Sequence, residues 1–336
     1  GSGRYGIYES VLLTASPSSG GSSTTYSDWG VDVAIVLDES GSMGTARAQL
    51  QAIFSQVESL LTTAGIGTGA FVNNYALVGF GGEKSGHPSH GHIDVPFGSF
   101  STLNSYLGSM PANVFQGNDE DGYSGISYAI DNLAWRAESN VIKLVLLVTD
   151  EDRNHHYYTE GGSTQALQFS ALKSDLNAIN AKFISATQSY LYDNTAAVVL
   201  GYKYGGKTYK ADGAGGFTNG VGGNAGAGYK ISGAGGDTGV YPTGQKEEYV
   251  YLAQDPGIQG SSWDFGQTRV GGTTAASFQN AMIAALVEDI SLSITTTWSW
   301  QFVGWYDQNA NLLSTSPVYS FPAVNSQNFI GRFVEV

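Results

Sequence analysis

The stretch VDVAIVLDESGSMG, residues 31–44, decides the fold of this chain. Its first part is nearly continuous in Val, Ile and Leu, which is typical of a strand buried on both faces of a sheet. The strand then ends in Asp38, Ser40 and Ser42, which are separated by single residues. Oxygen-bearing side chains at this spacing on a loop can all point in one direction. The stretch therefore predicts a buried strand whose exit loop holds a polar site.

Beyond this strand, apolar runs alternate with segments of helical periodicity. The clearest helix lies at residues 45–65, and the second strongly apolar strand lies at residues 141–150. Strands that alternate with helices predict an α/β fold with a doubly wound, mostly parallel sheet covered on both faces. We expect further strands at residues 75–81, 92–100, 182–189 and 247–254, and further helices at residues 123–136, 164–181 and 276–290.

The two ends of the chain differ from its middle. Residues 1–24 and 297–336 alternate like strands, and we expect them to form one small split β domain. The α/β domain would then span residues 28–292, inserted between the two parts. It contains a Gly-rich insertion at about residues 201–245, whose segment YKYGGKTYKAD predicts a hairpin turning at its Gly-Gly pair. Because the chain opens with GSG and shows no signal peptide, we take it as part of a longer protein.

Composition narrows the classes of partner. The chain has 336 residues and a formal net charge of −14, so its surface repels phosphate backbones and a nucleic-acid partner is not expected. No apolar run reaches the ~18 residues of a membrane span, so direct membrane insertion is not expected. The absence of cysteine excludes disulfides, thiolate metal sites and cysteine nucleophiles. Nothing in the sequence indicates an oligomeric state.

The Asp-Ser-Ser triplet has two interpretations. Its hard oxygens suit Mg²⁺, Ca²⁺ or Mn²⁺, but Ser42 could equally serve only as a helix N-cap. Two other loops favour the metal, because the acidic segment at residues 117–126 precedes a predicted helix and Asp150 ends the second apolar strand. In an open parallel sheet such loops meet beyond the carboxyl ends of the strands. Carboxylates gathered there would repel one another without a cation among them.

The segment AIVLDESGSMG resembles the Asp-x-Ser-x-Ser motif of von Willebrand factor type A (VWA) domains, and LLVTD resembles that family's third metal-binding loop. The resemblance covers roughly residues 28–292. It implies a Rossmann-like fold and a metal-ion-dependent adhesion site, abbreviated MIDAS. It also implies that Asp38, Ser40, Ser42 and Asp150 bind the metal.

The second loop departs from the pattern that many family members share, because it lacks a Thr within Gly-Gly-Thr. The segment EDGYSGI is instead similar to the integrin β version, in which a Glu binds the metal. This likeness implies Glu120 as a ligand, with Asp119 as its competitor. A carboxylate in place of Thr adds negative charge, which weakens the attraction of an acidic ligand and favours Ca²⁺ over Mg²⁺. Asp121 and Asp152 are candidates for a second cation.

Residues beside these ligands are expected to form a rim that a partner contacts. The expected rim residues are Glu39, Met43, Glu151, His155 and His156.

The segment SGHPSHGH, residues 85–92, carries His87, His90 and His92. Spaced imidazoles can bind Zn²⁺, but neither a cysteine nor a well-spaced carboxylate completes a tetrahedral set in the sequence. We therefore expect a solvated loop.

The end segments resemble an internalin-type B-repeat, a small β module of bacterial surface proteins. The resemblance rests on the short phrases LTASP, FVGWYD and LLSTSPVYSF. It implies a VWA domain inserted into a B-repeat-like module.

Together these features predict a non-enzymatic adhesion module at a bacterial cell surface or in the extracellular space. It would bind one divalent cation, Mg²⁺ or Ca²⁺ with Mn²⁺ as a third candidate, and an extracellular protein or surface ligand that offers an acidic group. The alternative is a structural segment of a surface fibre or tip, in which the metal only makes the loops rigid. Catalysis is not expected, because the ligands are hard oxygens and no Gly-x-Ser-x-Gly elbow is present.

Overall fold

The computed structural model describes most of the chain between residues 26 and 294, together with three strands nearer the C-terminus. The chain divides into two compact units, Gly1–Ser291 and Leu292–Val336, which we describe separately. The described residues are 26–83, 86–88, 90–117, 120–150, 158–160, 163–165, 169–188, 191–193, 197–221, 246–294, 300–306, 312–314 and 330–335.

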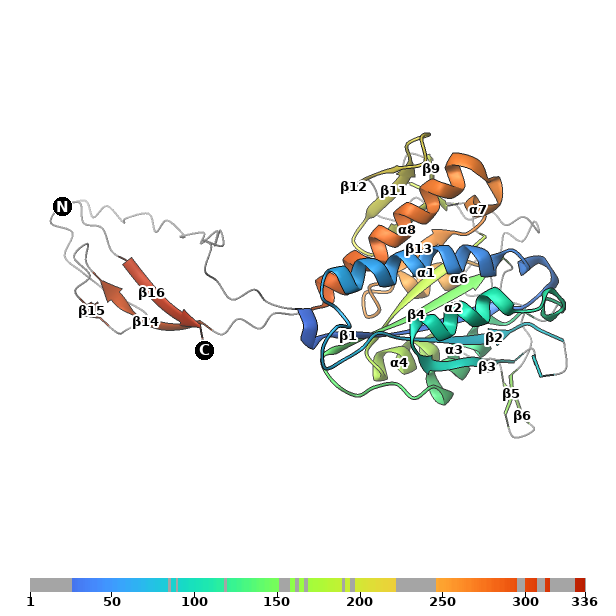
Figure 1. The fold of residues 1–336 in the computed structure, drawn as a ribbon, viewed down its shortest axis with the longest axis horizontal. Coiled ribbons are helices and arrows are strands. Elements are labelled where there is room, and N and C mark those ends of the chain that lie inside the picture. The colour runs from blue at the N-terminus through green and yellow to red at the C-terminus, as the bar shows by residue number, and fades with distance from the viewer. Residues whose placement is uncertain are drawn as a thin grey trace. The chain divides into compact units, whose positions relative to one another are not determined.

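The first unit is built on one large sheet, which has nine strands within the described residues (Figure 1). Their order is β12-β11-β10-β13-β7-β4-β1-β2-β3. The five central strands β13, β7, β4, β1 and β2 run parallel, and the strands at both edges pair antiparallel. The strands are β1 (Gly30–Asp38), β2 (Asn74–Phe80), β3 (His92–Gly98), β4 (Val141–Thr149), β7 (Ala181–Thr187), β10 (Gly201–Lys203), β11 (Lys207–Ala211), β12 (Phe217–Val221) and β13 (Ser261–Asp264).

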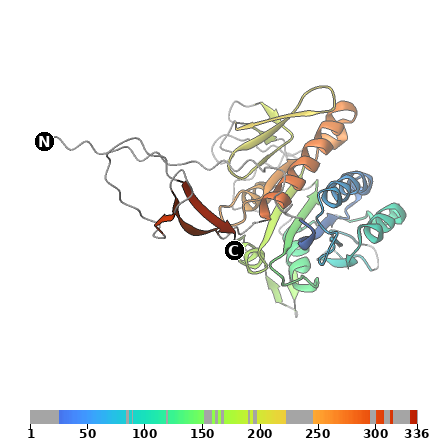
Figure 2. The ribbon, with the colours of Figure 1, turned by 60° about the vertical axis from the view of Figure 1, so that its left-hand side comes forward.

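Helices cover both faces of this sheet, which confirms the predicted mixed α/β fold with a mostly parallel sheet (Figures 1 and 2). On one face, residues of α3, α4 and α6 form a common core with Ala34, Val36 and Val78. On the other, Tyr75 of β2 packs against α1 and α2, and Trp263 of β13 packs against α8. The helices are α1 (Ala46–Thr63), α2 (Phe100–Ser109), α3 (Gly122–Asn132), α4 (Phe169–Ala178), α6 (Lys246–Ala253), α7 (Gln267–Val270) and α8 (Gly272–Ser293).

Short elements complete the first unit. The predicted hairpin is confirmed, since β10 and β11 pair around a turn in which Gly205 and Gly206 have φ values of 89° and 90°. None of the helices in the described part of the chain combines the length and apolar character of a membrane-spanning segment. The short elements are β5 (Tyr158–Glu160), β6 (Ser163–Gln165), β8 (Leu191–Tyr192), β9 (Val198–Val199) and the 3₁₀ turns η1 (Tyr26–Asp28), η2 (Gly41–Met43) and η3 (Ala112–Val114).

The centre of the sheet fixes where the polar loops begin. Every residue of β1 is buried. In the parallel register, Leu37 of β1 pairs with Val148 of β4, and Asp38 pairs with Phe80 of β2. The three strands therefore end at nearly the same level, and the loops that follow them start side by side at one edge of the sheet.

Two predictions about elements are wrong. The strand expected at residues 247–254 is absent, because residues 247–253 belong to helix α6. Its buried residues Tyr249, Leu252 and Ala253 recur at helical spacing while Tyr251 is exposed. The expected helix at residues 164–181 is observed only from Phe169, since residues 163–165 pair with β5 instead.

The second unit contains a three-stranded antiparallel sheet in the order β15-β14-β16 among its described residues. Its strands are β14 (Trp300–Tyr306), β15 (Leu312–Ser314) and β16 (Ile330–Glu335). Strands expected in the C-terminal segment are therefore present among its described residues. The other half of the expected split domain, residues 1–24, lies outside the described residues, so the split B-repeat-like domain stays a prediction.

The packing of α6 can be tested through Tyr249. Its hydroxyl accepts a hydrogen bond of 3.0 Å from the backbone N–H of Gly122, the first residue of α3. We expect Tyr249→Phe to lower the free energy of unfolding by about 1–3 kcal/mol, because it leaves a buried N–H without this acceptor. Urea unfolding measures the change, with Tyr204→Phe on an exposed turn as the control. Equal stability of the two variants would contradict the described packing.

Candidate metal centre

Asp38 ends β1 as a fully buried carboxylate. The backbone N–H of Ser40 donates to its Oδ1 at 2.7 Å, and the hydroxyl of Thr149 donates to its Oδ2 at 2.6 Å. Thr149 is the last residue of β4, so the parallel pairing of β1 and β4 brings this donor to Asp38. Both oxygens are held in fixed positions, and each retains a lone pair for a further partner.

The loop after β1 carries the two serines toward β4. The hydroxyls of Ser40 and Ser42 lie 3.2 Å apart, and the hydroxyl of Ser42 donates to Oδ1 of Asp150 at 2.8 Å. No side chain caps η2 or α1, so the interpretation of Ser42 as only an N-cap is wrong. Neighbouring oxygens around an ideal octahedral Mg²⁺ lie about 3.0 Å apart, because the bonds are about 2.1 Å long. The two measured spacings fit such an oxygen set.

The second acidic loop reaches the same place. A Cβ added to Gly81 would lie 2.9 Å from Oδ1 of Asp38 and 3.3 Å from Cγ of Glu120. The buried side chains of Asp38 and Glu120 therefore both lie against this glycine, which follows β2 and has a φ of 73°. Asp121 instead caps α3, because its Oδ1 accepts from the N–H of Tyr123 and its Oδ2 from the hydroxyl of Ser124.

The electrostatics of this edge favour a cation. Burial raises the pKa of the Asp38 carboxyl to about 7, and repulsion from Asp150 adds to the effect. Hydrogen bonds from Thr149 and Ser40 act in the opposite direction but do not offset the loss of water. A divalent cation would supply the positive charge that stabilises the ionised form.

Arg269 of α7 supplies one positive charge at the edge of this cluster. Its Nη2 donates to Oδ2 of Asp150 at 2.5 Å and to the backbone carbonyl of Ser42 at 3.1 Å, while its Nη1 donates to the side chain of Gln188 at 2.6 Å. Sequence reasoning missed this residue. Arg269 lies in a short segment after β13, and nothing in the local sequence indicates that it contacts Asp150.

The prediction of the rim residues is wrong for two of them. Glu39 and Met43 are fully buried, so neither can form an exposed rim. Glu39 turns away because successive side chains at the end of a strand alternate in direction. The remaining expected residues lie outside the described part of the chain, and so do two acidic candidates for metal binding. These residues are Glu151, His155 and His156 for the rim, and Asp119 and Asp152 for the metal.

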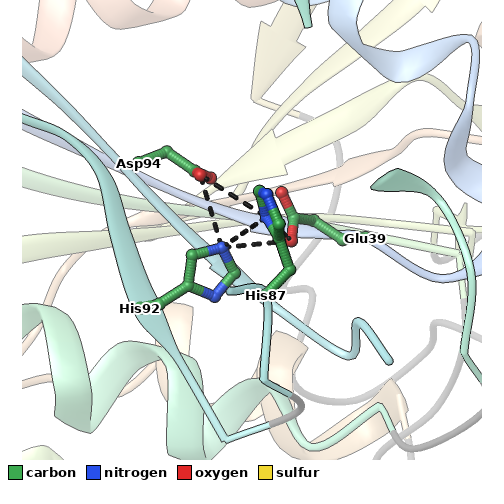
Figure 3. Close-up of side chains that lie close together, drawn as sticks. All are labelled: Glu39, His87, His92 and Asp94. Atoms are coloured by element: carbon green, nitrogen blue, oxygen red, sulfur yellow. Dashed lines mark hydrogen bonds and ion pairs between the residues drawn. The ribbon is translucent and has the colours of Figure 1, made fainter. Parts of the chain in front are cut away.

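The prediction of a solvated loop at the histidine segment is also wrong for two of its three histidines. His87 and His92 lie against Glu39 and Asp94, which are the carboxylates that sequence reasoning did not find (Figure 3). Burial lowers the pKa of His92, but hydrogen bonds and charge from Asp94 and Glu39 outweigh it and raise the pKa to about 9. His90 is exposed, as expected.

A family model matches the middle of this unit. Residues 32–181 match the family model of the von Willebrand factor type A domain, and this segment contains Asp38, Ser40, Ser42, Glu120 and Asp150. No curated protein matches the chain.

Several solved structures are similar to this chain. One is the pilus adhesin SpaC from Lactobacillus rhamnosus GG in its open conformation, with a TM-score of 0.45 and 14% identity over 84% of this chain and 33% of the adhesin. This chain therefore spans about a third of the adhesin's length. Another is an aerotolerance-related membrane protein from Bacteroides fragilis, with a TM-score of 0.40 and 16% identity over 78% of this chain and 99% of that protein. A third is proximal thread matrix protein 1 from the mussel byssus, solved with a zinc-occupied MIDAS motif, with a TM-score of 0.34 and 17% identity over 47% of this chain and 36% of that protein.

The cost of ionising Asp38 can be measured without added metal. Its folded-state pKa is raised from 3.8 to about 7, so the folded protein holds a proton that the unfolded chain has lost at intermediate pH. The contribution of Asp38 to stability therefore falls as the pH rises through this window, by about 1.4 kcal/mol per pH unit at most. We expect Asp38→Asn to gain stability relative to the parent between pH 4 and 7.

Urea unfolding in EDTA at several pH values measures this difference. Comparison of the two proteins at each pH cancels groups that titrate in both, including His92 and Glu39. A difference in unfolding free energy that stays constant with pH would contradict the raised pKa.

Proposed function

We propose that the VWA segment is a divalent-cation-dependent adhesion or ligand-binding module of a bacterial extracellular or cell-surface protein, and that it is not an enzyme. The observation that carries the proposal is the convergence of hard oxygens at one edge of the sheet, from the loops after β1 and β4, with the acidic loop before α3 beside them. The family match over residues 32–181 supports it.

In this proposal one cation, Mg²⁺ or Ca²⁺ with Mn²⁺ as an alternative, is held by residues from the loops described above. The hydroxyl and carboxylate oxygens lie 2.8–3.2 Å apart, close enough to bind one such cation together. An acidic side chain of an extracellular protein or surface ligand would complete the coordination, since a carboxylate is a preferred ligand of hard cations. The proposed ligands are Asp38, Ser40, Ser42, Glu120 and Asp150.

Metal binding is tested by thermal unfolding. After chelation, we expect Mg²⁺, Ca²⁺ or Mn²⁺ to raise the melting temperature of the parent, with a stabilisation of about 2.7 kcal/mol when the free cation is about 100 times its dissociation constant. Asp38→Ala should lose this response, whereas Glu138→Ala, an exposed carboxylate elsewhere, should keep it. An equal rise in melting temperature for the parent and for Asp38→Ala would refute the proposed site.

A second experiment separates ligand capture from a purely structural role. A peptide containing Glu is immobilised, and the same peptide with Gln is the control. If the metal site captures an acidic ligand, the parent protein should bind the Glu peptide in Mg²⁺. The same binding should be lost in EDTA, and the Asp38→Ala variant should not bind the peptide. Metal-dependent stabilisation without metal-dependent binding would favour the scaffold alternative.

Arg269 should oppose the proposed cation, because its guanidinium shares Asp150 with it. We expect Arg269→Gln to tighten Mg²⁺ or Mn²⁺ binding about tenfold, which corresponds to about 1.4 kcal/mol. We expect no larger effect, although two close positive charges repel each other strongly in a buried site. The side chain of Arg269 is one-third exposed, so solvent screens its charge. Calorimetric titration measures the affinity, and Arg269→Lys is the charge-conserving control. Weaker or unchanged binding in the Gln variant would refute the competition.

A further inference from the structure

Four side chains from three segments converge beside the loop after β1 (Figure 3). Glu39 follows the last residue of β1, His87 lies between β2 and β3, and His92 and Asp94 belong to β3. Each offers one ligand atom, and these atoms all lie within 4.8 Å of one another. We propose that this cluster, Glu39–His87–His92–Asp94, is a site for a divalent transition metal of the Zn²⁺ class, separate from the hard-oxygen site at Asp38.

The distances between the ligand atoms fit a tetrahedral ion. Nε2 of His92 lies 2.8 Å from Nδ1 of His87, 3.2 Å from Oε2 of Glu39 and 3.3 Å from Oδ1 of Asp94. Nδ1 of His87 lies 2.9 Å from Oε2 of Glu39 and 3.6 Å from Oδ1 of Asp94. Ligand atoms around tetrahedral Zn²⁺ lie about 3.3–3.4 Å apart, since the bonds are about 2.0–2.1 Å long. The five distances between ligand atoms range from 2.8 to 3.6 Å and therefore bracket the tetrahedral value.

Unpaired atoms in the cluster also indicate a ligand. Oε1 of the fully buried Glu39 and Oδ2 of Asp94 are buried without a hydrogen-bond partner. These two oxygens are not the ones that face the imidazoles, but they show that both carboxylates are buried with few hydrogen bonds. A cation bound at Oε2 of Glu39 and Oδ1 of Asp94 would offset the cost of burying their negative charge. Nδ1 of His87 and Nε2 of His92 face each other at 2.8 Å, and a bound Zn²⁺ would replace the proton that they share.

The backbone leaves room for this cluster. A Cβ added to Gly79 of β2 would lie 2.6 Å from Cδ of Glu39 and 2.6 Å from Cε1 of His92. A Cβ added to Gly82 would lie 2.7 Å from the carbonyl oxygen of His87. Glycine at these two positions is therefore required for the observed approach of the side chains.

The ligand types distinguish this site from the neighbouring one. Two imidazoles and two carboxylates suit Zn²⁺, whereas a set of hydroxyls and carboxylates suits Mg²⁺, Ca²⁺ or Mn²⁺. Tyr106 donates to Oδ1 of Asp94 at 2.6 Å, which orients this carboxylate as outer partners of metal ligands commonly do. Because Glu39 lies between Asp38 and Ser40 in the chain, a metal here would fix the loop that carries the hard-oxygen ligands.

Calorimetric titration of chelator-treated protein with Zn²⁺, in excess Mg²⁺, tests the proposal. The parent, Asp38→Ala and His90→Ala should each bind one equivalent of Zn²⁺ tightly, because His90 is an exposed histidine of the same segment. His87→Ala and His92→Ala should each lose at least 100-fold in affinity. Equal Zn²⁺ affinity in the parent and both of these variants would overturn the proposal, and so would loss of binding in Asp38→Ala alone.

A measurement on the parent protein avoids the risk that a variant fails to fold. X-ray absorption at the zinc edge should show four light ligands with scattering from two imidazoles, and Co²⁺ in place of zinc should give the visible spectrum of a tetrahedral ion. A zinc spectrum without imidazole scattering, or no bound zinc, would mean that the cluster is a proton-sharing set of ion pairs and would refute the site.

Discussion

The burial of a carboxylate at the end of a central strand is the constraint on which the rest of this structure depends. Asp38 lies where β1, buried along its whole length, emerges between β2 and β4. An ionised carboxylate at such a position is costly unless it is paired. The hydroxyl of Thr149 and the N–H of Ser40 provide two hydrogen bonds, but burial still raises the pKa of Asp38. The surrounding loops therefore form an environment that favours a bound cation.

The alternation of side chains after β1 gives this loop two sides. Asp38 and Ser40 turn toward the acidic loop before α3 and the end of β4, whereas Glu39 turns toward β3 and its histidines. The two sides differ in chemistry, since one offers only oxygen and the other offers oxygen and imidazole nitrogen. Movement of one set of ligands would displace the other, because adjacent residues of one backbone carry both. Arg269 adds a cation from α7 on the oxygen side.

The sequence predicted the sheet and the oxygen cluster because local patterns carried that information. Apolar strands that end in carboxylates identify the edge where parallel strands meet, and the resemblance to VWA domains supplied the residues on each loop. Helix α6 was mistaken for a strand because its Tyr, Val, Tyr and Leu residues form a short continuous apolar run, which fits a buried strand as well as a helix. The contacts of His87 with Glu39 and of Arg269 with Asp150 join distant parts of the chain, which no local pattern reports. Glu39 was placed on the wrong side although the local alternation of side chains along a strand directs it away from Asp38.

The most direct test of the central claim is anomalous X-ray diffraction from a crystal of the parent protein grown with Mn²⁺. The account predicts an anomalous peak within bonding distance of the oxygens of Asp38, Ser40 and Ser42, with Asp150 and Glu120 completing the shell directly or through water. The absence of a peak at these residues at saturating Mn²⁺, with the side chains ordered and Arg269 still bonded to Asp150, would contradict it.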